Sequence, residues 1–173
     1  SQDRERWQYD RMTTIMNNLT DAAFSTDDKG AILMYNAACL DLLDTNDTLK
    51  GRPISELFHL TDKDNQPIQL SDILSGATRT IRRDDLNHTY KDGESIRLEI
   101  TLSPIKSTYS TSRKSTEQAG YILIMRDVTK QKSLEEERDE FISVVSHELR
   151  TPVTIVEGSL SNLEVLMSRP QLP

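Results

Sequence analysis

Residues 21–36 read Asp-Ala-Ala-Phe-Ser-Thr-Asp-Asp-Lys-Gly-Ala-Ile-Leu-Met-Tyr-Asn, and this stretch decides how the N-terminal part of the chain folds. Residues 21–27 have the pattern of a short strand, and the apolar residues 31–36 predict the return strand. Between them, Asp28-Lys29-Gly30 supplies the residue types of a tight turn. The stretch therefore predicts a β-hairpin.

The segments that follow the hairpin change from a helical pattern to a strand pattern. Apolar residues at helical spacing predict short helices over residues 37–43, 54–58 and 70–79. Alternating or continuous apolar residues then predict strands over residues 86–90, 96–103 and 119–126, with a polar loop over 106–118. Two strands, several helices and three strands predict an α+β fold, with an antiparallel sheet and its helices on one face.

Both ends of the chain are predicted to be helical. Residues 1–19 carry apolar side chains at roughly helical spacing, which predicts an amphipathic lead-in helix. Residues 130–140 contain no Gly or Pro, and Val128, Leu134 and Phe141 fall near heptad spacing. This pattern predicts a short parallel coiled coil, with a solvated single helix as the alternative.

An apolar stripe continues along this helix to Met167, and nothing else in the chain is an obvious partner for it. The same helix of a second copy would cover the stripe. We therefore expect a homodimer through residues 128–167.

The C-terminal helix contains the sequence Ser-His-Glu-Leu-Arg-Thr-Pro at residues 146–152. His147 lies about 200° around the helix from the apolar positions 145 and 149, so it points away from the seam. A solvated polar face is the simplest interpretation of such a histidine. A zinc motif of the type H-E-x-x-H would need a second histidine where Thr151 stands, so no metal site is expected.

Composition narrows the possible functions. The chain has 173 residues, a net charge of −7 and a pI near 5.0, which argues against nucleic-acid binding. Its single cysteine, Cys39, excludes an internal disulfide and suits a reducing compartment. No run of 18 apolar residues is present, so no membrane span is predicted, and a cytoplasmic segment cut from a larger protein is expected.

The hairpin region resembles a PAS sensor domain. The resemblance is carried by Thr-Asp-Asp-Lys-Gly-Ala-Ile at 26–32, by Tyr-Asn-Ala-Ala at 35–38, and by Arg-Asp-Val-Thr at 126–129, which is similar to the signature that ends such domains. It implies a PAS fold over residues 20–129, with a five-stranded antiparallel sheet and short helices on one face. Family members bind haem, flavin, small metabolites or nothing.

The C-terminal motif resembles the phosphoacceptor box of sensor histidine kinases, F-x-x-x-x-S-H-E-L-R-T-P, beginning at Phe141. The resemblance implies that residues 141–169 are the truncated first helix of a dimerisation and phosphoacceptor domain. It makes His147 the acceptor of the γ-phosphoryl group of ATP, Glu148 the adjacent acid/base group, and Thr151 the residue linked to phosphatase activity. Pro152, which cannot donate a backbone N–H, is expected to kink the helix.

The same resemblance implies partners that this chain does not contain. They are the ATP-binding domain of the same protein, with ATP and Mg²⁺, and the receiver domain of a response regulator. The chain has no Walker loop and none of the family's ATP-binding motifs, so it is not expected to be active alone. The resemblance also implies a parent protein anchored in the cytoplasmic membrane. The alternative function is a stand-alone PAS module for ligand binding and dimerisation.

Three candidate residues inside the PAS region are interpreted as structural. Cys39 is expected to be a buried thiol, and His59 and His88 are isolated in the sequence, so neither is expected to bind haem. No cofactor is expected in this chain, and its ligand cannot be read from the sequence. Asp127 and Thr129 lie where the last strand becomes the linker helix, and one of them is expected to cap that helix and tie it to the PAS core.

Overall fold

The computed structural model describes the backbone of residues 2–106 and 118–168, and the side chains of residues 2–106 and 119–150. The chain divides into two units, residues 1–129 and residues 130–173, and each is described by itself. The predicted coiled-coil linker and phosphoacceptor helix both lie in the second unit.

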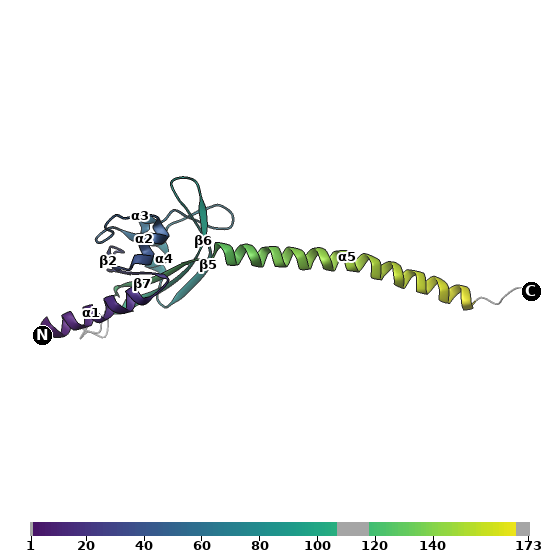
Figure 1. Cartoon of the computed structure of the whole chain (residues 1–173), viewed down its shortest axis with the longest axis horizontal. Helices are drawn as coiled ribbons and strands as arrows, with labels where there is room; N and C mark the ends of the chain where they lie inside the picture. Colours follow the sequence, from purple (N-terminus) through teal and green to yellow (C-terminus); the bar gives the residue numbers. More distant parts are fainter. Residues whose placement is uncertain (1, 107–117, 169–173) are drawn as a thin grey trace, which may run out of the picture. The chain divides into compact units, whose positions relative to one another are not determined.

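Figure 1 shows the helices and strands in chain order. The N-terminal unit begins with one helix and continues with a sheet and short helices: α1 Gln2–Asn18, β1 Ala22–Thr26, β2 Ile32–Tyr35, α2 Ala37–Leu43, α3 Ile54–Leu57, β3 Leu60–Thr61, β4 Pro67–Ile68, α4 Leu70–Gly76, β5 Ile81–Thr89, β6 Ser95–Lys106 and β7 Gln118–Asp127. A single helix, α5 Thr129–Ser168, follows β7.

The sheet is antiparallel throughout, in the order β2-β1-β7-β6-β5-β3-β4. The predicted hairpin is confirmed as the pair β1–β2. Its turn is fixed by the Asp27 carboxylate, which accepts the backbone N–H groups of Lys29 and Ala31, both at 2.9 Å. Gly30 adopts a φ of 86° there, a conformation that glycine reaches without strain.

The sheet differs from the five-stranded prediction, because the described residues form seven strands. The two additional strands, β3 and β4, have two residues each and pair at the edge beside β5. A period of two cannot be recognised in segments this short. Strand β5 also begins at Ile81 instead of residue 86, since the polar run 82–85 hides the alternation and contains a shift in strand register.

The core lies between the sheet and the short helices. The apolar run predicted as a strand forms β7, in which Tyr121, Leu123 and Met125 are buried. Phe24 of β1 pairs with Leu123 across the two strands. Figure 1 shows α2, α3 and α4 together over one face of the sheet, where they contribute Cys39, Ile54, Leu70 and Leu74 to the same buried cluster.

The C-terminal end of α1 is joined to the core through Asn36, which is 2% exposed. Its amide nitrogen donates to the carbonyl oxygens of Met16 at 2.8 Å and Asp21 at 2.9 Å, and its amide oxygen accepts the backbone N–H of Ala23 at 3.1 Å. This one side chain therefore connects the end of α1 to the first strand. All its polar atoms have partners, as burial requires.

The second unit consists of α5, which continues through position 152 and ends at Ser168. No interruption separates the predicted coiled coil (130–140) from the predicted phosphoacceptor helix (141–169). The bend expected at Pro152 stays a prediction, because the side chains of Thr151 and Pro152 lie outside the residues whose side chains the structure describes. Within the described residues, neither α5 nor any other helix has the length and apolar character that crossing a membrane requires.

Candidate functional site

The predicted phosphoacceptor lies on the surface of α5. His147 and the adjacent Glu148 are both exposed, which leaves the imidazole accessible to a partner. Phe141 and Leu149, on the predicted seam, are 68% and 59% exposed in the single chain. The described helix therefore presents both the histidine and an uncovered apolar stripe.

The junction between β7 and α5 is held by side-chain hydrogen bonds. The Asp127 carboxylate accepts the backbone N–H of Thr129 at 2.9 Å and also its hydroxyl proton. The same Thr129 hydroxyl oxygen accepts the backbone N–H of Arg97 in β6 at 2.8 Å, and the Val128 N–H donates to the Arg97 carbonyl at 2.9 Å. Val128 and Thr129, where α5 begins, are thereby held to strands β6 and β7.

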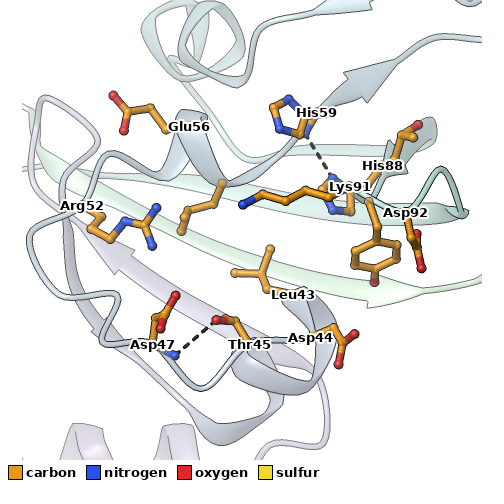
Figure 2. A pocket seen from close by; sticks show the side chains of 13 residues that line it. Leu43, Asp44, Thr45, Asp47, Arg52, Glu56, His59, His88, Lys91 and Asp92 are labelled. Carbon is orange, nitrogen blue, oxygen red and sulfur yellow. Dashed lines mark hydrogen bonds between the residues drawn. The ribbon is translucent and has the colours of Figure 1, made fainter.

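A cavity of about 360 Å³ lies among the end of α2, α3, the end of β5 and the turn between β5 and β6 (Figure 2). Leu43 and Leu57 supply apolar wall, and His59, His88 and Tyr90 supply aromatic rings. Several charged side chains stand around it. The volume is within the range of small-ligand sites, although the lining carries more polar and charged side chains than such sites usually have.

The pairing of β3 with β5 brings the two histidines of the N-terminal unit together, although they are isolated in the sequence. The His59 backbone N–H donates to Nδ1 of His88 at 3.1 Å, and their rings stack 6.4 Å apart at 8°. Phe58 and Tyr90 meet the His88 ring edge-to-face at 5.3 and 4.7 Å. Sequence reasoning missed this pairing because β3, which sets the register with β5, has only two residues and leaves no recognisable pattern.

Burial lowers the pKa of His88 to about 4, and the charge of His59 adds to the effect in the same direction. His88 is therefore neutral near neutral pH. Its Nδ1 accepts a hydrogen bond, so the proton of the neutral ring resides on Nε2.

This buried histidine predicts acid sensitivity of the N-terminal unit. The unfolded chain protonates His88 near its ordinary pKa, whereas the folded chain resists protonation until about pH 4, so unfolding takes up a proton between these values. Stability is expected to fall by about 2 kcal/mol from about pH 7 to about pH 5 through this group. In urea unfolding, the free energy of unfolding of His88→Gln should lack this decrease of about 2 kcal/mol between pH 7 and pH 5. The variant His59→Gln should keep most of the decrease. Equal slopes in the wild type and His88→Gln would contradict the assignment.

Tyr90 connects the cavity to the junction of α5. Its hydroxyl donates to the carbonyl oxygen of Leu42 at the end of α2. Tyr90 also lines a second cavity of about 290 Å³, on whose wall Asp127 and Asp21 lie. Burial raises the pKa of Tyr90, and the negative charge of Asp127 is the next largest cause. Tyr90 thus borders both cavities, the second of which extends to the end of β7.

Cys39 is fully buried, as predicted. Its sulfur lies 3.1 Å from the Ala23 carbonyl oxygen and from Oδ1 of Asn36, and burial raises its pKa to about 11. The thiol is therefore a packed, unreactive group. Across the residues with described side chains, no three His, Cys, Asp or Glu groups are arranged to hold a metal ion.

Comparison with known proteins agrees with the fold of the N-terminal unit. The family profile described as "PAS domain" matches residues 20–130. The chain is 30% identical over 163 residues to the sensor histidine kinase WalK of Bacillus subtilis, covering 88% of this chain and 23% of that protein. It is 28% identical over 155 residues to the sensor protein kinase WalK of Staphylococcus aureus, covering 89% of this chain and 34% of that protein.

The chain therefore spans only a minor part of the length of these curated relatives. Among solved structures, the PAS domain of BvgS from Bordetella pertussis has a TM-score of 0.51 at 16% identity. The superposition covers 79% of this chain and 98% of that one. At this identity the likeness concerns the fold alone.

Proposed function

The chain belongs to the PAS domain family, and from that premise we propose that it is the sensory and dimerisation segment of a two-component sensor histidine kinase. The observation that carries the proposal is the extent of the WalK similarity. The PAS match ends at residue 130, but 88% of the chain is aligned with the Bacillus subtilis kinase. The alignment must therefore include part of α5. The exposed His147 then lies in the segment that the kinase relatives share.

In this proposal His147 receives phosphate from ATP bound to a catalytic domain outside this chain. An imidazole nitrogen attacks the γ-phosphorus, an N–P bond forms, and the bond to the bridging oxygen breaks to release ADP. Glu148 accepts the proton that the imidazole loses. The phosphoryl group is then transferred to an aspartate of a response regulator, a reaction that we propose for the whole kinase. Thr151 and Pro152 keep their predicted roles in phosphatase activity and helix bending.

The test is phosphorylation in trans. The chain is mixed with the separately produced ATP-binding domain of the Bacillus subtilis relative, ATP and Mg²⁺, and acid-labile, base-stable phosphate is measured on the chain. Labelling that depends on the added domain supports the proposal. Its absence, with the added domain active on its own kinase helix, would leave the stand-alone PAS module as the function.

We further propose that the segment is cytoplasmic in a membrane-anchored parent. Locating the full-length protein in cell fractions would test this proposal.

We expect the chain to form a parallel dimer through 128–167. Phe141 is 68% exposed on α5 and lies on the same helical face as Leu134 and Leu149, so a second helix would remove these side chains from water. Phe141→Glu should raise the dimer dissociation constant at least roughly tenfold, because it would bury a carboxylate in the seam. Ser143→Glu, about 200° away on the helix, is the matched control. Analytical ultracentrifugation measures both, and a wild-type monomer at high micromolar concentration would contradict the dimer.

The junction is proposed to pass conformational changes of the sheet to α5. Asp127→Ala removes the carboxylate that holds both the N–H and the hydroxyl of Thr129, a loss expected to cost about 1 kcal/mol. That cost is comparable to typical allosteric coupling energies of roughly 1–3 kcal/mol. In the full-length kinase, Asp127→Ala should change the ratio of kinase to phosphatase activity several-fold while the PAS unit stays folded. Unchanged ratios in Asp127→Ala and Thr129→Ala would show that the junction only tethers the helix.

A further inference from the structure

We propose that the cavity beside His88 binds a small carboxylate, with Arg52 and Lys91 as its anion contacts. The proposal rests on the sensory function proposed above and names the chemical class of the signal. The cavity is the one of about 360 Å³ between α2, α3 and the end of β5.

The directions of the two cationic side chains carry the inference. Figure 2 shows Lys91, from the turn after β5, extending across the cavity, and Arg52, from the segment before α3, extending toward it from the opposite side. Neither side chain takes part in an ion pair within the described part of the chain. Both residues are exposed, so water screens the repulsion between their charges. A bound anion between the two side chains would be attracted by both.

Among the residues with described side chains, no carboxylate of the lining forms an ion pair with Arg52 or Lys91. Four of them belong to its lining, at Asp44, Asp47, Glu56 and Asp92. Figure 2 shows the carboxylates of Asp44, Glu56 and Asp92 directed away from the two cationic groups. The fourth, Asp47, lies on the same side of the cavity as Arg52 but forms no ion pair with it. A ligand in the cavity would therefore meet the cations before Asp44, Glu56 and Asp92, although the lining carries more carboxylates than cations.

The rest of the lining indicates the body of the ligand. Leu43 and Leu57 offer apolar contact, and the rings of His88 and Tyr90 pack edge-to-face at 4.7 Å on one wall. The Tyr90 hydroxyl already donates to the carbonyl of Leu42. These groups favour a compact apolar or aromatic body over a sugar or a polyanion. A cavity of this volume is at the small end of the range for ligand sites, about 300–1,000 Å³.

Five probes test the charge and the body of the ligand separately. The chain is titrated at constant ionic strength with benzoate, benzamide, benzylammonium, hexanoate and inorganic phosphate, and binding is followed by the amide chemical shifts of the ¹⁵N-labelled protein. Benzoate should saturate and shift amides of residues 43–45, 56–59 and 88–92. It should bind at least roughly tenfold tighter than benzamide, since a charge-assisted contact replaces a neutral one. Phosphate, which has no apolar body, should bind more weakly than benzoate.

Charge-removing variants then locate the contact. Arg52→Gln and Lys91→Gln should each weaken benzoate binding roughly tenfold. The control is Lys63→Gln, which removes an exposed lysine of the β3–β4 turn that does not line the cavity and should leave the affinity unchanged. A variant that fails to fold would lose the dispersed amide spectrum and is replaced by the corresponding Arg→Lys or Lys→Arg change, which should retain most of the binding.

Several results would overturn the proposal. They are equal binding of benzoate and benzamide, tighter binding of benzylammonium or phosphate than of benzoate, equal losses in Lys63→Gln, and no saturable binding of either benzoate or hexanoate. None of these measurements depends on His147. A chain that binds benzoate but accepts no phosphate on α5 would support this site and contradict the kinase assignment. A chain that accepts phosphate but does not bind benzoate would support the kinase assignment and contradict this site.

Discussion

His147→Gln is expected to abolish acid-labile phosphorylation of this chain by an added ATP-binding domain. Glutamine keeps a polar side chain on an exposed helical position, so α5 should remain folded, but the nucleophilic imidazole is lost. Labelling should therefore fall to the background of a reaction without ATP-binding domain, while sedimentation shows the same association state as the wild type. The measurement is incorporation of labelled γ-phosphate, resolved by its acid lability.

The controls use the other histidines and the neighbouring acid. His59→Gln removes the other exposed histidine of the chain and should leave labelling unchanged. Glu148→Gln should slow labelling by about 10²–10⁴ without preventing it, because a positioned base is lost while the nucleophile remains. Acid-labile phosphate on His147→Gln at the wild-type level would refute the phosphoacceptor assignment, whatever the outcome for Glu148.

Gly120→Ala is expected to destabilise the N-terminal unit by about 3 kcal/mol or more. Gly120 lies near the start of β7 with φ at 152°, opposite Ile105 of β6. A Cβ atom at this position would come within 2.0 Å of the backbone carbonyl oxygen of Thr26 in β1. Backbone atoms of a paired strand cannot move aside as a flexible side chain can, so β1 and β7 would have to separate locally.

Gly93→Ala is the matched control, because Gly93 also has a positive φ, 91°, but a Cβ there meets no atom within 4 Å. It should cost only the backbone strain, about 1 kcal/mol. Urea unfolding followed by circular dichroism gives both values. Small domains are stable by only about 5–15 kcal/mol, so Gly120→Ala is measured at low temperature to keep a folded population. Equal losses in the two variants would show that β1 and β7 leave room for a methyl group at position 120.

The sequence by itself determined the parts of this protein that depend on local pattern. The hairpin was predicted because its turn residues and flanking apolar residues are adjacent in the chain. The strand β7 was predicted from its continuous apolar run, and α5 from residues that contain no helix breaker before Pro152. His147 and Glu148 were predicted as site residues in the same way, since the phosphoacceptor motif is contiguous; their roles stay predictions, and both side chains are exposed on α5.

Only the tertiary structure decided the contacts between residues far apart in the chain. His59 and His88 meet because β3 pairs with β5, and β3 is too short to leave a pattern. Arg52 and Lys91 face one cavity because the fold places the segment before α3 and the turn after β5 on opposite sides of it. Gly120 is constrained by the backbone of Thr26, which lies 94 positions earlier in the chain. A pattern read over a few neighbouring residues cannot reveal such a contact. Periodicity reports which face of an element is buried, whereas strand pairing sets which distant side chains share a site.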